Sequence, residues 1–261
     1  MLSDFEMIIH KFPERQDITI IPIADVHLGA RECMEQEFYE FINSIKETPN
    51  VYVVLCGDLL NNAVKSSVSN IYDEVYRPSE AKKIMAKVLS PIADRILCSV
   101  TGNHERRSSR EVDDDPNYDI MCKIDKEELH RENIAFMKLQ FGRLDGDGAS
   151  NPTYTIVVSH GSGGGSLTGG TVNKNERFGY AIDNMDMFIT AHSHRPLVTN
   201  PGKIYIDQRN NRVSIKPFKV VTATSWLNAG GYSLQKLMTP TSYVKQTILL
   251  RGNRKEMVVS M

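Results

Sequence analysis

Five short β-rich runs of the sequence each end in side chains that can bind a metal ion. The runs are DITIIPIAD (17–25), VYVVLCGD (51–58), RILCSVTGNH (95–104), TYTIVVSHG (153–161) and DMFITAHSH (186–194). The side chains at or just after their ends are Asp25, His27, Asp58, Asn103, His104, His160, His192 and His194. In α/β sheets, ligands bind outside the carboxyl ends of the strands. We therefore expect these groups to lie together at one end of the fold.

The prediction of a metal site depends on all of these groups standing at strand ends together, because each group alone has an ordinary structural role. An aspartate at a strand end often caps the next helix, and a single histidine is more often structural than a ligand. Five of the seven histidines stand at these strand ends, which a structural origin does not explain. The other two, His10 and His130, lie among charged residues, and we expect both at the surface.

The donor types predict the class of ion. Imidazole, carboxylate and amide groups suit divalent ions such as Mn²⁺, Fe²⁺ or Zn²⁺. The four cysteines show no CxxC or related metal spacing, so the sequence contains no thiolate set for a structural zinc. Seven such ligands are more than one ion needs, whereas two ions roughly 3.5–4 Å apart use them with one bridging carboxylate. Such a pair activates water and holds phosphoryl oxygens during in-line displacement.

The segments between the runs predict the elements that position these groups. Helical patterns cover ECMEQEFYEFINSIKET (32–48), RPSEAKKIMAKVLSPIA (77–93) and NYDIMCKIDKEELHRE (117–132), the last after an Asp-Pro helix start. Alternating strands and helices predict an α/β fold built from βαβ units. The last third differs. There, KIYID (203–207) with RVSIKP (212–217), and the segment 247–259, predict two antiparallel hairpins.

Length and composition restrict the function classes. The 261 residues contain no linker, so we predict one domain over 1–261. A formal net charge of −1 excludes binding of nucleic acid by bulk attraction alone. No apolar run approaches the roughly 18 residues of a membrane span, and the N-terminal segment lacks the apolar region of a signal peptide. With Cys56 and Cys98 expected as buried, reduced thiols, we predict a cytoplasmic location.

The motifs DxH, GD, GNHE, HG and HxH, in this order, resemble those of the calcineurin-like metallophosphoesterase superfamily. The resemblance extends from residue 17 to about residue 230 and implies two mixed β-sheets packed as a sandwich in a four-layer α/β/β/α arrangement. It implies one ion held by Asp25, His27 and His194, a second held by Asn103, His160 and His192, and Asp58 bridging both. It also implies that His104 contacts the phosphate and protonates the leaving oxygen. Ala191 stands where the family usually has glycine, and no ligand is lost.

Residues beside the motifs are candidates for contacts with the substrate. Basic residues flank three motifs, which indicates a polyanionic substrate. The candidates are Arg106, Arg107, Asn62 and Arg195. Glu105 either orients a ligand or forms a salt bridge, and both readings stay open. The segment GSGGGSLTGGT (161–171) is either a flexible surface loop or a mobile flap whose N–H groups approach phosphate.

The resemblance leaves the subfamily open. ADVHLGA is similar to the SbcD-type DNA repair nucleases, whereas GNHE is similar to the Ser/Thr protein phosphatases. We expect no separate DNA-capping domain of the kind that such nucleases carry. We expect a two-metal phosphodiesterase or nuclease acting on DNA, RNA or a nucleotide, with Mn²⁺ as the preferred ion and Fe or Zn as alternatives. Other hypotheses are a phosphomonoesterase, including a protein phosphatase, and a scaffold without turnover. A homodimer is a further expectation, since dimers occur among the nuclease relatives.

Overall fold

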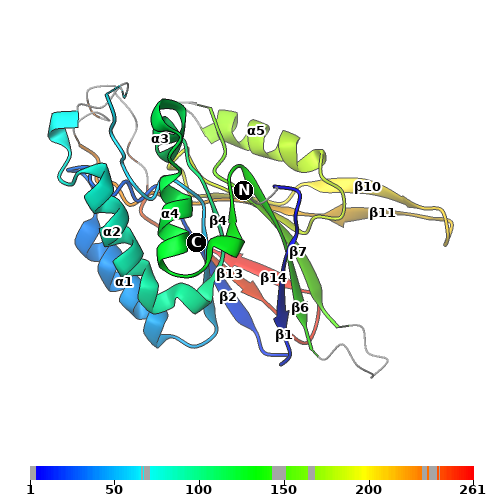
Figure 1. Ribbon diagram of the computed structural model, residues 1–261. Coiled ribbons are helices and arrows are strands. Elements are labelled where there is room, and N and C mark those ends of the chain that lie inside the picture. The colour runs from blue at the N-terminus through cyan, green and yellow to red at the C-terminus, as the bar shows by residue number, and fades with distance from the viewer. Residues whose placement is uncertain are drawn as a thin grey trace.

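Two six-stranded sheets face each other in the computed structural model (Figure 1). The structure describes residues 4–65, 67, 71–142, 151–163, 168–230, 234, 240 and 242–261. The first sheet has the order β14 (Met257–Ser260), β13 (Thr247–Leu250), β2 (Ile18–Ile23), β3 (Val51–Leu55), β4 (Ile96–Val100), β5 (His130–Arg131). The second has the order β1 (Ile8–Phe12), β6 (Ile134–Phe141), β7 (Thr153–Ser159), β8 (Met187–Thr190), β12 (Lys219–Thr222), β9 (Leu197–Thr199). A separate two-stranded ribbon pairs β10 (Gly202–Asp207) with β11 (Arg212–Pro217).

Strands β2, β3 and β4 of the first sheet are buried on both faces. Side chains alternate along a strand, so Ile18 and Ile20 of β2 enter the core between the sheets. Ile21 and Ile23 of the same strand pack in the core beneath the helices. β2, β3 and β4 pair in parallel, and they lie in the middle of the molecule between the two cores. Burial on both faces explains why they appear in the sequence as continuous apolar runs.

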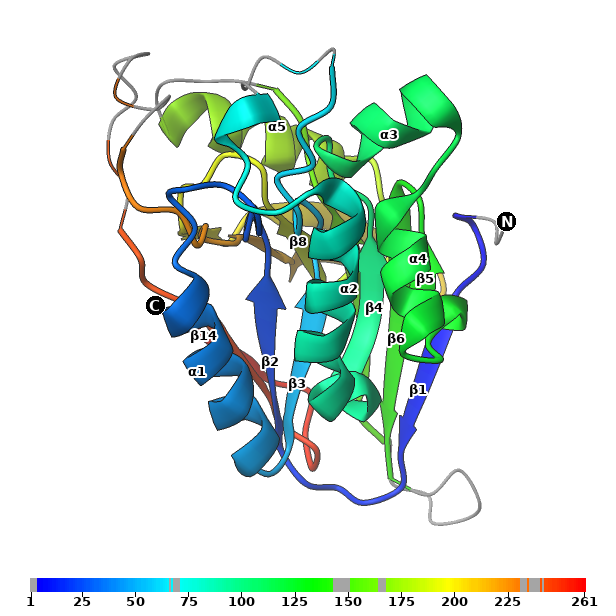
Figure 2. The ribbon, with the colours of Figure 1, turned by 60° about the vertical axis from the view of Figure 1, so that its left-hand side comes forward.

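Helices cover the outer faces of both sheets and complete the four α/β/β/α layers. Figure 2 shows α1 (Glu35–Glu47), α2 (Pro78–Leu89) and α4 (Pro116–Lys123) in front of β2, β3 and β4. On the other side, α5 (Thr168–Tyr180) packs over the second sheet through a buried amide. The Nδ2 of Asn175 donates to the hydroxyls of Thr190 (2.8 Å) and Thr222 (3.1 Å). No helix in the described part of the chain is both long enough and apolar enough to cross a bilayer.

The five predicted strands and both hairpins are confirmed, and each strand ends before its polar residues. The helix predicted over 117–132 is wrong in its second half, because the chain turns at Asp125, which has a φ of 55°. After the turn come the 3₁₀ segment Glu127–Leu129 and strand β5. Two other 3₁₀ segments cover Ile71–Asp73 and Ser90–Arg95. Helices α3 (Glu105–Val112) and α5 and strands β1, β6, β9 and β12 are additional to the prediction.

The surface positions predicted for two histidines are also wrong. His130 is buried in β5, where its Nε2 lies 3.2 Å from Asp115 Oδ2. His10 is partly buried in β1, and its Nε2 lies 2.8 Å from the carbonyl oxygen of Leu97. His10 stands on a strand whose side chains alternate in burial, and both residues of the short strand β5 are buried. Charged sequence neighbours therefore do not predict the exposure of either ring.

Candidate metal centre

Sharp turns directly after the strands direct the predicted donors to a common site. Asp25, His27, Asp58, His192 and His194 all have positive φ, between 50° and 68°. This conformation is uncommon for residues other than glycine, and it is concentrated at functional sites. The strands therefore end early so that strained turns can present the polar side chains.

One glycine allows two of these turns to touch. A Cβ atom added to Gly102 would lie 2.1 Å from Asp58 Oδ1 and 2.2 Å from Asp58 N. Any larger residue at position 102 would collide with the backbone after β3. Gly102 is thus required for the close approach of the segment after β4, which carries Asn103 and His104, to Asp58.

A first cluster contains Asp25, His27 and His194. The Nε2 of His194 lies 3.3 Å from Asp25 Oδ1 and 3.3 Å from His27 Nε2. The distance from His27 Nε2 to Asp25 Oδ1 is 3.8 Å. One donor atom from each residue therefore points to the same small volume, and this cluster can hold a metal ion.

A second cluster contains Asn103, His160 and His192. Asn103 Oδ1 lies 2.9 Å from His160 Nε2 and 2.7 Å from His192 Nδ1. The two ring nitrogens are 3.2 Å apart. Asp58 Oδ2 lies between the clusters, 3.3 Å from His160 Nε2 and 3.9 Å from His27 Nε2. The structure thus brings all seven predicted ligands together and places the Asp58 carboxylate between the two groups.

The donor geometry fits divalent cations. Asp25 Oδ1 is buried and has no hydrogen-bond partner in the described structure, although a buried carboxylate oxygen normally has one. His27 and His194 face each other through their Nε2 atoms. Two neutral imidazoles can face one another in this way only if they share a proton or a cation. A cation at each cluster satisfies both the carboxylate and the imidazole lone pairs.

The pKa values in the clusters reflect burial and the two aspartates. Burial lowers the pKa of His27 far below its usual value, and the charge of His104 lowers it further. Burial also lowers the pKa of His192. For His160, burial acts in the same direction, but the Asp58 carboxylate outweighs it and raises the pKa to about 9. A bound cation would compete with that proton, because a metal requires the neutral imidazole.

Glu105 supports the turns that carry the donors. Its fully buried carboxylate accepts hydrogen bonds from the main-chain N–H groups of Asp58, Leu60 and Gly102, each at 3.0 Å. Burial, together with the charge of Asp58, raises the pKa of Glu105 to about 8. Cations beside Asp58 would favour the charged form of Glu105 again. Of the two interpretations open for this residue, these contacts match that of an orienting residue.

His104 is held as one tautomer beside Asp58. Its Nδ1 lies 2.7 Å from the carbonyl oxygen of Asn61, and its Nε2 lies 3.0 Å from Arg107 Nη2. A guanidinium group only donates, so Nε2 accepts this bond and Nδ1 carries the proton. Burial lowers the pKa of His104, opposed by Asp58 and reinforced by Arg107. The Nε2 atom is 3.8 Å from Asp58 Oδ2, which places it at the edge of the two clusters.

The other candidates for substrate contacts have different surroundings. Arg106 Nη2 donates to the carbonyl oxygens of Thr101 and Glu132, which holds its guanidinium against the main chain. Asn62 is buried, and its Nδ2 donates to the His104 carbonyl oxygen and to Ser108 Oγ. Arg195 is partly buried directly after His194. Arg107 hydrogen-bonds the imidazole ring of His104, whereas Asn62 contacts its carbonyl oxygen.

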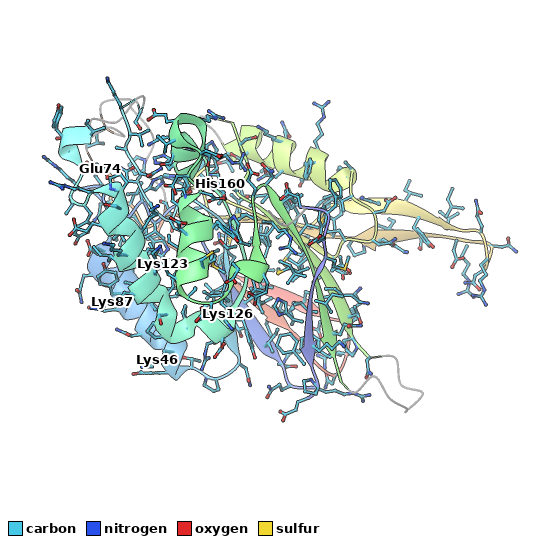
Figure 3. All side chains as sticks on the ribbon, in the orientation of Figure 1. Lys46, Glu74, Lys87, Lys123, Lys126 and His160 are labelled. Carbon is cyan, nitrogen blue, oxygen red and sulfur yellow. The ribbon has the colours of Figure 1, made fainter. Side chains whose placement is uncertain are left out.

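The support behind His104 was not predicted from the sequence. The carbonyl oxygen of Asn61 receives both His104 Nδ1 and Arg107 Nη1, the latter at 3.2 Å. The side chain of Asn61 in turn donates a short hydrogen bond to Glu74 Oε1. A main-chain oxygen gives no residue-type signal, and Glu74 lies outside every motif. Figure 3 shows Glu74 and His160 toward the same end of the molecule, whereas Lys46 and Lys87 lie lower on the helical layer.

Two cavities lie on different sides of these clusters. The larger, about 460 Å³, is lined by Ala63, Val64, Lys65, Ile71, Glu74, Val75, Arg77, Pro78 and Glu80. Glu74, which lines it, contacts the side chain of Asn61, and the Asn61 carbonyl oxygen in turn contacts His104 Nδ1. The smaller, about 120 Å³, is lined by Ser162, Gly163, Gly170, Thr171, Lys174, Asn175, Ala191, His192 and Ser193. Of the segment 161–171, residues 164–167 lie outside the described part, and the residues from Thr168 belong to α5.

Comparison with known proteins identifies a family. The model of the calcineurin-like phosphoesterase family matches residues 18–196. No curated protein matches the chain in sequence. Similar solved structures include a predicted phosphoesterase from Streptococcus pneumoniae TIGR4, with 11% identity over 94% of this chain and 98% of the other and a TM-score of 0.38. A metallophosphoesterase from Sphaerobacter thermophilus is 14% identical over 94% of this chain and 89% of the other, with a TM-score of 0.40.

A further similar structure is the NAD nucleotidase of Haemophilus influenzae. It is 11% identical, and the match covers 94% of this chain and 49% of the nucleotidase, with a TM-score of 0.40. The chain therefore spans about half the length of that protein.

Proposed function

The chain belongs to the calcineurin-like phosphoesterase family, and from this premise we propose that it is a phosphodiesterase acting on nucleic acid or a nucleotide. Membership makes it a metal-dependent phosphoric ester hydrolase, and the choice of diester and of substrate is the proposal. The proposed ligands are Asp25, His27 and His194 for one ion, and Asn103, His160 and His192 for the other, with Asp58 bridging. The two clusters and the position of Asp58 between them support this assignment.

Bound divalent ions, with Mn²⁺ as our first choice, supply positive charge for phosphoryl oxygens and lower the pKa of water. The chain itself supplies His104 and Arg107. In the structure, the guanidinium group of Arg107 hydrogen-bonds the Nε2 atom of His104. A substrate phosphate can take over this guanidinium as a charge-assisted partner. His104 Nε2 is then free to carry the proton that the leaving oxygen requires.

The two cavities are the reason for proposing a phosphodiester substrate and not a monoester. A phosphodiester has an organic group on each side of the phosphorus, whereas a monoester has one. The 460 Å³ cavity is lined by Glu74, whose partner Asn61 supports His104 through its carbonyl oxygen, and its volume suits a nucleoside-sized group. The 120 Å³ cavity is lined by His192 and offers a second, smaller space. Lys174 lines the smaller cavity, which supports an anionic group there, whereas Lys65 and Arg77 of the larger cavity are matched by Glu74 and Glu80.

The proposal is tested with bis-p-nitrophenyl phosphate beside p-nitrophenyl phosphate. Metal-stripped protein is repleted with Mn²⁺, and the His104→Ala protein serves as the control. We expect a higher kcat/KM for the diester, and this result leads to labelled DNA, RNA and cyclic nucleotides as the next substrates. A preference for the monoester contradicts the diesterase assignment and favours a phosphomonoesterase. No turnover of either ester by metal-loaded protein supports the scaffold hypothesis.

The cysteines support the proposed location. Cys33, Cys56, Cys98 and Cys122 are all free thiols, and Cys56 and Cys98 are buried. Burial raises the pKa of Cys33 to about 12, so this thiol is unreactive. Unpaired thiols are typical of reducing compartments, and we infer a cytoplasmic location.

A further inference from the structure

The ribbon of β10 and β11 extends away from both sheets. Figure 1 shows it projecting from the body of the protein beyond α5. In the described structure, its two strands form strand pairing only with each other. An isolated two-stranded hairpin is at best marginally stable in water, so a ribbon of this kind normally packs against another surface.

The register of the ribbon separates apolar from polar side chains. Ile204 lies opposite Ile215, and Ile206 lies opposite Val213, so these four β-branched side chains share one face. They are 78%, 73%, 66% and 70% exposed, respectively. We call these four residues the apolar ribbon face. Such a continuous exposed apolar face is uncommon in a monomer and marks an interaction site.

The opposite face of the ribbon is polar, and near its base it contacts the body of the protein. Lys203 donates to the carbonyl oxygen of Ile182, and its Nζ lies 5.6 Å from the centre of the Phe218 ring. Further along the ribbon, Lys216 Nζ lies 3.2 Å from the centre of the Tyr205 ring. Lys203 and Tyr205 alternate with Ile204 and Ile206 along β10. The apolar ribbon face is therefore directed away from the contacts that Lys203 makes with the body.

We propose that the apolar ribbon face binds the same face of a second copy of this chain. The face carries no charged residue, so an apolar and nearly flat partner surface is required. The ribbon itself is such a surface, and a two-fold axis makes the contact self-complementary. The basic side chains of Lys203, Arg212 and Lys216 lie on the other face of each ribbon. They point away from the apolar faces when two such faces stack about 10 Å apart, so pairing brings no like charges into contact.

The size of the face predicts a weak dimer. A fully exposed Val or Ile side chain offers about 60–120 Å² of apolar surface. Eight side chains at the exposures given above therefore bury roughly 350–700 Å² of apolar surface when two ribbons pair. This area is below that of a standard stable interface, so we expect dissociation at micromolar concentrations. The dimer is independent of the proposed catalytic activity, because no ribbon residue belongs to the metal centre.

Sedimentation velocity of the full chain from about 1 to 300 μM tests the proposal. We expect the wild-type protein to shift from monomer to dimer over this range. Ile206→Glu places a charge in the apolar ribbon face and is expected to raise the dimer dissociation constant at least tenfold. Ser214→Glu, on the polar face of the same ribbon, is the matched control and should leave it unchanged. Far-ultraviolet circular dichroism checks that both variants are folded.

Cross-linking gives an independent measurement of the same contact. Ile206→Cys should form a covalent dimer under mild oxidation with diamide, and Ser214→Cys should not exceed the wild-type background. A monomer at every concentration overturns the proposal, as does a dimer that Ile206→Glu leaves intact. The same two variants are tested on anionic vesicles. Binding of the wild-type monomer to vesicles, lost in Ile206→Glu, would assign the face to a lipid surface and likewise overturn the proposal.

Discussion

We propose that His104 transfers a proton, although together with His27 and Asp58 it also forms a group that could hold a metal ion. Its Nδ1 is fixed by the carbonyl oxygen of Asn61, so its Nε2 faces the site. We predict that His104→Ala lowers kcat by about 10²–10⁴-fold, the usual range for loss of a general acid. Mn²⁺ content, measured by elemental analysis, should stay at the wild-type level. Full activity in this variant would eliminate His104 as the proton donor.

Arg107 and Arg106 offer a matched comparison of neighbouring arginines. The Arg107 guanidinium contacts His104 Nε2, whereas that of Arg106 is engaged by main-chain carbonyl oxygens. Lysine keeps the charge of arginine but loses its planar fork of donors. We predict that Arg107→Lys lowers kcat/KM for the diester at least tenfold, mainly through KM. Arg106→Lys should stay within about threefold of the wild type, and equal effects of the two changes would contradict the role given to Arg107.

Residue types alone were sufficient to predict which side chains meet at the site. Asp and His at successive strand ends converge because parallel neighbouring strands end at the same edge. The positive φ of Asp25 and Asp58 could not be predicted, since neither residue type requires it. The contact between the Asn61 carbonyl oxygen and His104 could not be predicted either, because every residue has a carbonyl group.

At the scale of elements, strongly patterned segments were predictable and weakly patterned ones were not. α1 has regular apolar spacing and was predicted close to its observed bounds, Glu35–Glu47. α5 was missed because glycines disfavour a helix and three lie within its 13 residues. β1 was missed because it pairs with β6, more than a hundred residues away. Pairing across such a distance leaves no local signal in the sequence.

Helix α4 provides a test of pH dependence. Asp115 caps this helix by accepting from the N–H groups of Asn117 and Tyr118, and it also contacts His130. Burial raises the pKa of Asp115, but the hydrogen bond and charge of His130 outweigh it, so the pKa lies below its usual value. A carboxyl group with a lowered pKa stabilises the fold above the unfolded value of about 4. The stabilisation by Asp115 is lost as the pH falls through the lower pKa that this group has in the folded protein.

Two substitutions separate the cap from the charge. Asp115→Asn keeps a good capping side chain and removes the charge, whereas Asp115→Ala removes both. We predict that Asp115→Ala lowers the free energy of unfolding at pH 7 by at least about 1 kcal/mol. Asp115→Asn should lose less stability than the wild type between pH 5 and pH 3. Urea unfolding at several pH values measures both, and an Asn variant with the wild-type pH dependence would refute the assignment.

In the whole molecule, the metal centre lies where the two sheets come together. Asp25, Asp58 and Asn103 follow strands of the first sheet, whereas His160, His192 and His194 follow strands of the second. Each cluster therefore contains residues from both sheets, and bound ions link the two halves of the sandwich.

Metal removal is accordingly expected to destabilise the entire fold. A ligand at a hundred times its Kd stabilises a protein by about 2.7 kcal/mol. Removal of two such ions should lower Tm by roughly 10 °C or more for a chain of this size. Differential scanning calorimetry of the chelated and Mn²⁺-repleted protein measures this change. An unchanged Tm after complete stripping would show that the ions do not join the sheets.

The most direct test of the central claim is a count of bound ions. Metal-stripped protein is dialysed against Mn²⁺, and the bound metal per chain is measured for the wild type and for Asp58→Asn. We predict two Mn²⁺ ions per wild-type chain and weakened binding of both in the variant, because Asp58 lies between the two clusters. A single ion in the wild type, or the loss of only one ion in Asp58→Asn, would contradict the bridged two-ion site.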